Sequence, residues 1–114
     1  MYVAVVLKLR TALQAQSFEA FARDRWLPSL DTRPTRIGQL SSARLLRRHR
    51  AVESEPIDTD NEFLLISEWD GPAAFLDLPR SRDEALGKAF EAFDVKVTPV
   101  GRFETVAELA GEAV

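Results

Sequence analysis

The sequence predicts one α+β domain built on a four-stranded antiparallel sheet. Stretches rich in Val, Leu and aromatic residues alternate with stretches whose apolar residues recur every three or four positions. Their order is strand, helix, long strand, strand, two-part helix, strand, and it extends over residues 2–106 of 114. This length suits a single domain, 1–114, in which 106–114 is a tail. We expect helices on one face of the sheet only.

Tyr2–Leu9 is the first expected strand, because Val and Leu dominate it. A helix should follow with Ser17 as its N-cap. Its apolar face has helical spacing, and consists of Phe18, Phe21, Ala22 and Trp26. Pro28 should end or kink this helix, since proline lacks the N–H donor and clashes with the preceding turn.

A long second strand is expected from Ile37 to about Arg50, although a helix over Leu40–Arg48 is a rival on propensity. The strand is preferred because it can pair with Phe63–Trp69, the clearest strand in the chain. The acidic segment Ala51–Asn61 between them contains Pro56 and reads as a hairpin loop.

The second helix is expected in two parts. A short helix over Ala73–Leu78 should break at Pro79, and Ser81 with Glu84 has the spacing of a capping box for the longer part. The core face of that part is Leu86, Ala89, Phe90 and Phe93. Val95–Val106 should form the last strand, bent at Pro99–Gly101, and the chain from Glu104 onward should leave the sheet.

Composition excludes several functional classes. The chain has 46% apolar and 29% charged residues, as globular domains do, and it lacks cysteine, which rules out disulfides and thiolate chemistry. We find no glycine-rich phosphate loop, nucleophile elbow or metal-spaced cluster, so no cofactor or metal is expected. A net charge of −3 argues against nucleic acid. No apolar run suggests a membrane span or signal peptide, so we expect a soluble cytoplasmic protein.

Three motifs carry a family resemblance: RDRWLPSL at the end of the first helix, the arginine-rich end of the second strand, and ISEWDGPAAFLDLP. Together with the ferredoxin-like βαββαβ order, they resemble the dimeric α/β-barrel superfamily, in which the sheets of a homodimer close into one barrel. Members include antibiotic-biosynthesis monooxygenases, polyketide cyclases, EthD-like proteins and RedY-like proteins. The resemblance implies a cleft between the inner face of the sheet and the helices or the partner chain.

The resemblance also sharpens what to expect of the chemistry. Trp69 matches a tryptophan of the cofactor-free monooxygenases, but Leu65 stands where they have an amide, which argues against oxygenation. Haem-degrading members need an Asn–Trp–His set. Here Asn61 is expected in a loop and the one histidine on a strand, so haem binding is not expected.

His49 and Glu68 are the candidate catalytic residues. His49 is the one histidine, and the arginines beside it favour the neutral imidazole that a general base needs. Glu68 precedes Trp69 on the third strand, from which its carboxylate is expected to reach His49 or an arginine across the strand pair, or to act as the acid itself. The alternatives are a solvated histidine and a simple ion pair.

The candidate substrate-binding residues are mostly apolar, with a few polar groups to orient a flat ligand. Alternation puts Glu68 and Trp69 on opposite faces, and also separates Arg44 from Arg47, so only one arginine should point into the cleft. Core or dimer packing is the alternative for the apolar members. The candidates are Phe63, Leu65, Ser67, Trp69, Trp26, Arg44 and Arg47.

These observations lead to one leading hypothesis and two rivals. We expect a cofactor-independent enzyme of bacterial specialised-metabolite biosynthesis that acts on an aromatic polyketide, indole or pyrrole intermediate. Acid–base chemistry would drive a cyclisation, dehydration or rearrangement. One rival is a cofactor-free monooxygenase of the same fold. The other is a non-catalytic dimer that binds or steers a pathway intermediate.

Overall fold

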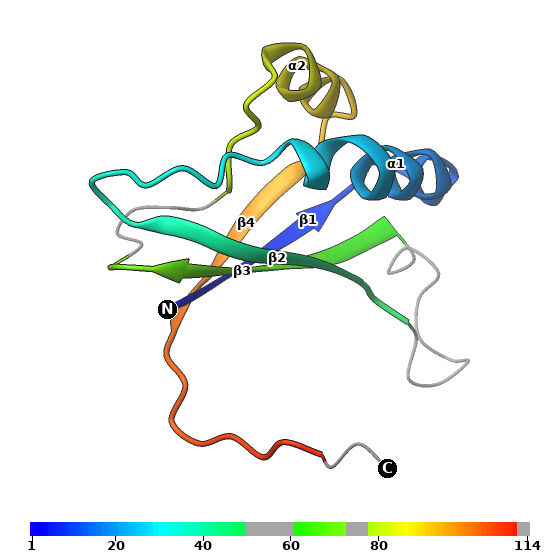
Figure 1. Cartoon of the computed structure of the whole chain (residues 1–114). Coiled ribbons are helices and arrows are strands. Elements are labelled where there is room, and N and C mark those ends of the chain that lie inside the picture. Colours follow the sequence, from blue (N-terminus) through cyan, green and yellow to red (C-terminus); the bar gives the residue numbers. More distant parts are fainter. Residues whose placement is uncertain (50–60, 73–77, 112–114) are drawn as a thin grey trace.

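The computed structural model describes residues 1–49, 61–72 and 78–111. Four strands form one antiparallel sheet: β1 (Tyr2–Lys8), β2 (Gln39–Arg47), β3 (Glu62–Asp70) and β4 (Lys96–Phe103). Their spatial order is β2-β3-β1-β4, and each neighbouring pair is antiparallel. The helices α1 (Ala15–Phe21) and α2 (Glu84–Ala92) lie over one face of this sheet (Figure 1). The expected α+β fold with its four-stranded antiparallel sheet is therefore confirmed.

The first helical region starts earlier than predicted and ends at Ser29, one residue after Pro28. A 3₁₀ turn at Ala12–Gln14 leads into α1, so Ser17 lies inside the helix and the N-cap prediction is wrong. A π-helical turn, Ala22–Trp26, and a second 3₁₀ turn, Leu27–Ser29, continue the path past Pro28. Proline is tolerated there because it falls in the first positions of a new turn, where its missing N–H is not needed.

Helix α2 also begins differently from the prediction. Asp83, not Ser81, is its N-cap, and the Asp83 Oδ1 accepts a hydrogen bond from the Ala85 N–H at 2.9 Å. The Ser81 hydroxyl accepts instead from the Asp83 N–H at 3.1 Å, so the Ser81–Glu84 capping box does not form. A carboxylate suits this position because it favours the positive end of the helix dipole. The short helix expected over Ala73–Leu78 falls almost wholly outside the described residues.

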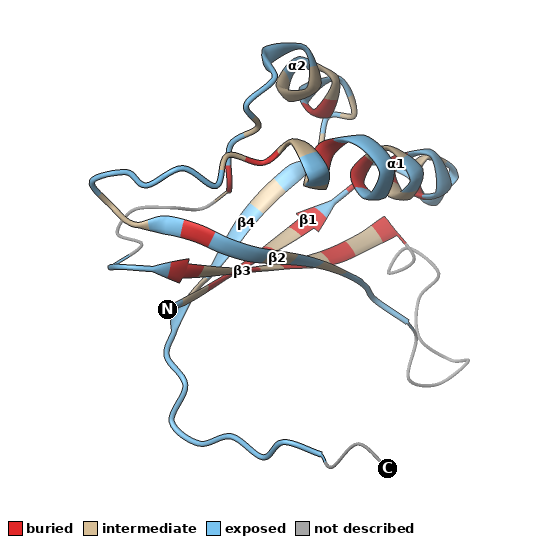
Figure 2. Cartoon of the chain, viewed as in Figure 1, coloured by how far each residue is buried: buried red, intermediate tan, exposed pale blue. Residues whose placement is uncertain are grey.

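The hydrophobic core lies between the sheet and the helices. Odd-numbered residues of β1 and β3 point toward this layer and are buried (Figure 2). Phe18 of α1 is fully buried, with its ring 5.2 Å from that of Phe63 and 5.8 Å from that of Phe90. Trp26 stacks on Phe90 at 4.6 Å. All these side chains occupy one side of the sheet, so the other side contributes little to the core.

The two edge strands agree with the predictions in kind and differ in length. Residues Gln39–Arg47 pair with β3 as a strand, so the rival helix is excluded. In β4 the pairing steps from Ala4↔Gly101 to Val5↔Pro99, which leaves Val100 as the extra residue of a bulge at the predicted bend. β4 ends at Phe103, before the predicted Val106, and residues 104–111 are exposed outside the sheet.

Candidate functional site

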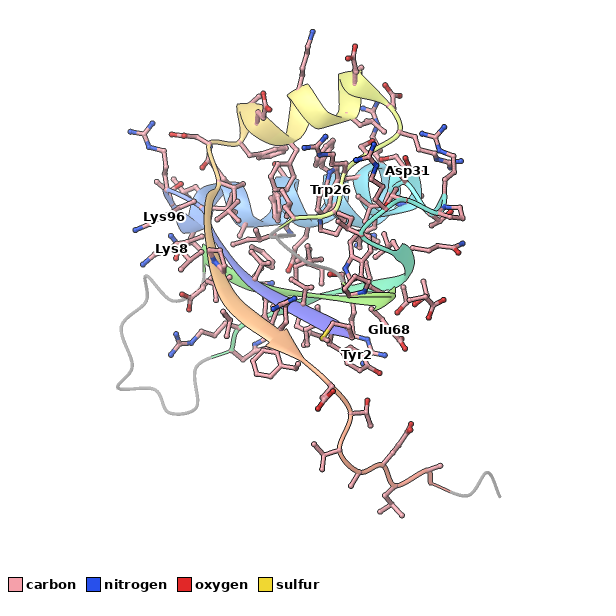
Figure 3. All side chains as sticks on the ribbon, turned by 90° about the vertical axis from the view of Figure 1, so that its left-hand side faces the viewer. Tyr2, Lys8, Trp26, Asp31, Glu68 and Lys96 are labelled. Carbon is pink, nitrogen blue, oxygen red and sulfur yellow. The ribbon has the colours of Figure 1, made fainter. Side chains whose placement is uncertain are left out.

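The face of the sheet that none of the described helices covers, which we call the open face, has an apolar middle and polar ends. Val6 pairs with Leu64 and Ala4 with Ile66 at its centre. Lys8 and Lys96 lie together at one end, whereas Tyr2 and Glu68 lie at the other (Figure 3). The face therefore combines an apolar surface with charged groups at known places.

A hollow of about 490 Å³ lies at the Glu68 end of the open face, and we call it the sheet-face cavity. Its volume is within the range of small-molecule sites. Its lining contains a carboxylate, a guanidinium, a hydroxyl, an aliphatic side chain and two aromatic rings, which come from all four strands. These are Glu68, Arg44, Ser42, Ile66, Tyr2 and Phe103, and Ala4 completes the lining.

Local irregularity in β2 positions the polar part of this cavity. The pairing steps from Leu40↔Trp69 to Ser42↔Glu68, so Ser41 is the extra residue of a bulge. The Ser42 hydroxyl donates to the Glu68 Oε2 at 3.2 Å, and the Ser41 hydroxyl donates to the Glu68 backbone oxygen at 3.1 Å. Glu68 is half-buried, and its carboxylate is thus oriented from the neighbouring strand.

Arg44 supplies the positive charge of the sheet-face cavity. It pairs in register with Ile66, two residues from Glu68 on the same face of β3. Among the described residues, Arg44 makes no ion pair within 4.0 Å. A guanidinium without a carboxylate partner, beside aromatic rings, is suited to an anionic or electron-rich planar ligand.

His49 and Glu68 are not brought together in one chain. His49 is exposed just beyond β2, and the neighbouring Arg48 N–H donates to the backbone oxygen of Glu62. Glu62 and Glu68 are at opposite ends of β3, which corresponds to roughly 20 Å along an extended strand. Of the arginines, it is Arg44 that shares a cavity with Glu68.

The predicted apolar wall lies on the helix side of the sheet and is packed in the core. Phe63, Leu65, Ser67 and Trp69 are all buried. The Trp69 indole N–H donates to the Ser67 hydroxyl at 2.9 Å, so both polar groups are satisfied inside the protein. In the single chain these four side chains therefore belong to the hydrophobic core. Glu68 and Trp69 face opposite sides of the sheet, as expected.

Arg47 and Trp26 border two other hollows on the helix side. Arg47 lies 3.4 Å from Glu19 of α1, in a hollow of about 330 Å³ that Phe63 also lines. Trp26 lines a hollow of about 750 Å³ beside α2, with Phe90 and Pro79. The candidates Arg44, Arg47 and Trp26 therefore lie in three separate hollows of the structure.

Sequence reasoning missed Tyr2, Ser42, Ile66 and Phe103 as lining residues. Ile66 could have been found from the sequence, because alternation along β3 puts it on the same face as Glu68. Tyr2 and Phe103 are at the ends of strands that become neighbours only in the folded sheet, where they pair directly. Ser42 reaches this face through the bulge at Ser41, which no local pattern announces.

The described residues contain no metal-binding cluster and no membrane-spanning helix, and no known protein matches the chain. Across residues 1–49, 61–72 and 78–111, no group of three or more His, Asp or Glu residues is placed to hold a metal ion. Within the same ranges, every helix is too short or too polar to cross a membrane. No protein-family model, curated protein or solved structure matches the chain.

Proposed function

We propose that the protein works as a homodimer of the dimeric α/β-barrel type, with a ferredoxin-like sheet in each subunit. In this arrangement the open faces of two sheets meet and enclose the two sheet-face cavities. The support is the one-sided helix layer, which leaves Leu64, Ile66 and Val6 without cover from the described helices (Figure 1). A second copy would bury this apolar surface, and the burial of apolar surface is the main driving force for association.

The charges of the open face are self-complementary under a two-fold axis. Lys8 and Lys96 pair directly across β1 and β4, and like charges at such positions repel. Neither makes an ion pair within the described part of the chain. If the strands of the two sheets run in opposite directions across the axis, Glu68 of one subunit approaches this lysine pair of the other. Each contact then occurs twice.

Within the enclosed cavity we propose cofactor-independent acid–base chemistry on an aromatic intermediate of specialised metabolism. The observation that carries this proposal is that Glu68, Arg44, Tyr2 and Phe103 line one hollow. The aromatic rings would hold a flat substrate, and the Glu68 carboxylate would take a proton from it and return the proton at another atom. Arg44 would stabilise the negative charge that develops on the deprotonated ring system. Cyclisation, dehydration and rearrangement all require such a transfer.

The first test is native mass spectrometry against polycyclic phenols and indolic or pyrrolic acids. We expect a dimer that carries an aromatic adduct. Arg44→Ala should weaken adduct binding at least about tenfold, which corresponds to ~1.4 kcal/mol. Arg25→Ala, which removes an exposed arginine from the helix layer, should leave binding unchanged.

The outcomes separate the proposal from its rivals. A monomer without adducts would contradict both the dimer and its cavity. Conversion of the bound compound without oxygen uptake supports acid–base chemistry, whereas conversion with oxygen uptake would identify a monooxygenase. A stable adduct that never converts would identify a binding protein that shields or steers an intermediate.

A further inference from the structure

The segment that follows β4, residues 104–111, is an unpacked arm with two large apolar side chains. Every residue in it is exposed. Val106 is 93% and Leu109 is 95% exposed, values far above those of partly covered residues such as Phe103 at 51%. Exposing such side chains to water is unfavourable, and burying them against another apolar surface is favourable. The arm therefore has a reason to pack on a surface.

The path of the arm points to the side on which it packs. It leaves the sheet directly after Phe103, which lines the sheet-face cavity. From there it runs on the side of the open face, at a distance from the sheet of its own chain (Figure 1). The view turned by 90° shows the same separation (Figure 3). The arm and the open face are thus on one side of the molecule and do not cover each other.

Composition and charge match the arm to the open face. The arm carries the acidic residues Glu104 and Glu108 between its apolar ones. At its β2 edge the open face carries Arg44, which makes no ion pair within the described ranges. Its edge strand β2 also exposes one large apolar side chain, Leu46, at 40%. Apolar residues can thus meet apolar residues while acids meet bases.

The arm is also long enough to reach another subunit. Eight extended residues cover up to about 26 Å, whereas four strands spaced about 4.8 Å apart span about 14 Å. An arm that begins at the β4 edge can therefore cross to the far edge of a facing sheet.

We infer that in the dimer the arm of each subunit packs on the other subunit, along the β2 edge of its open face over Leu46, and closes the sheet-face cavity. The occupant of this edge is a second copy of the chain, so the inference rests on the proposed dimer. It adds that the cavity is complete only when the arm of the other subunit covers it.

Engineered cysteines test the contact directly, because the chain has none of its own. Leu109→Cys and Leu46→Cys are made in separate chains, mixed and oxidised. We expect a disulfide-linked dimer that contains one chain of each kind. Leu13→Cys, at an equally exposed leucine of the helix layer, is the matched control and should not link to Leu46→Cys. Equal linking of both pairs, or a double variant that oxidises within one chain to a covalent monomer, would overturn the inference.

A second measurement separates the arm from the dimer itself. Val106→Asp with Leu109→Asp should raise the dimer dissociation constant at least about tenfold by analytical ultracentrifugation, and Leu13→Asp should not change it. A monomeric wild-type protein would defeat the proposed dimer and the arm together. A dimeric wild-type protein with an unaffected double variant would defeat only the arm.

Discussion

Glu68 and Trp69 are neighbours in the chain but belong to opposite sides of the sheet. The side chain of Trp69 is buried in the hydrophobic core, where its indole N–H donates a hydrogen bond to the Ser67 hydroxyl. The Glu68 carboxylate is on the open face, oriented by the Ser42 hydroxyl and beside Arg44. This separation follows from the two-residue period of a strand. A ligand on the open face would therefore contact Glu68 and not Trp69.

The proton-transfer role can be assigned by comparing three variants on any substrate that converts. Glu68→Gln should lower turnover about 10²- to 10⁴-fold, the usual contribution of a general acid–base group. Glu62→Gln, on the same face of β3 at its other end, should turn over like the wild type. His49→Ala should also remain active, because His49 is exposed and is not one of the residues that line the sheet-face cavity. Loss of turnover in His49→Ala alone would return the role to the histidine.

Asp31 offers a pH-dependent test of the segment that leads into β2. Hydrogen bonds from the Arg33 side chain, and then from its backbone N–H, lower the pKa of Asp31 to about 2. A lowered pKa means that the ionised form stabilises the fold above the ordinary pKa of 3.8, and that this contribution disappears as the pH falls toward about 2. Arg33→Gln should raise the pKa of Asp31 toward 3.8, as measured by NMR titration of the carboxyl carbon. Arg36→Gln is the control, and an unchanged Asp31 in Arg33→Gln would contradict the assignment.

At the scale of elements, two glycines control how β2 meets β3. Gly38 has φ +127° and Gly71 has φ +113°, conformations that other residues rarely adopt. A Cβ on Gly38 would clash with the Asp70 backbone oxygen. This close approach sets the first pair of the ladder, Gln39↔Asp70, from which the bulge at Ser41 and the Ser42–Glu68 contact follow.

Gly38→Ala should therefore destabilise the protein by about 1–3 kcal/mol in urea unfolding, since it adds backbone strain and a clash. Gly87→Ala is the matched control, because Gly87 lies inside α2 and a Cβ there meets nothing within 4 Å. It should stabilise by about 0.5–1 kcal/mol through helix propensity. Equal effects of the two substitutions would contradict a special role of Gly38 in the pairing of β2 with β3.

The whole molecule is a sheet with helices on one side, and among the residues that the structure describes most of the exposed large apolar side chains lie on or near the other side. Leu46 pairs with Leu64 and Phe103 with Tyr2, which puts both on the open face, and Val106 and Leu109 follow in the arm. The exposed arm is pale blue in Figure 2. A chain of 114 residues builds only a modest core, so leaving a sheet face in water would remove stability that it needs. These surfaces are the support for the proposed association of two chains.

A dimer of this kind predicts that thermal stability depends on protein concentration. A tenfold rise in concentration should increase Tm by about 3 °C, because association is linked to folding by mass action. Differential scanning fluorimetry over three decades of concentration measures this directly. A Tm that stays constant over that range would show that the folded state does not depend on association.

Local patterns in the sequence were enough to predict the order of elements and which apolar residues share one face of an element. Phe18 and Trp26 recur at helical spacing and Phe63 and Leu65 at strand spacing, and all four are buried. These features were readable because periodicity and the preferences of single residues act over a few neighbouring positions.

Tertiary structure alone decided which strands are neighbours, and with them the composition of the cavity. Tyr2 and Phe103 are about 100 residues apart in sequence and become a direct pair only because β1 lies between β3 and β4. The bulge at Ser41 brings Ser42 to Glu68, and the antiparallel register leaves His49 at the far end. The physical reason is that pairing between distant strands is selected by burial of the whole sheet face against the helices, a requirement that no short stretch of sequence contains.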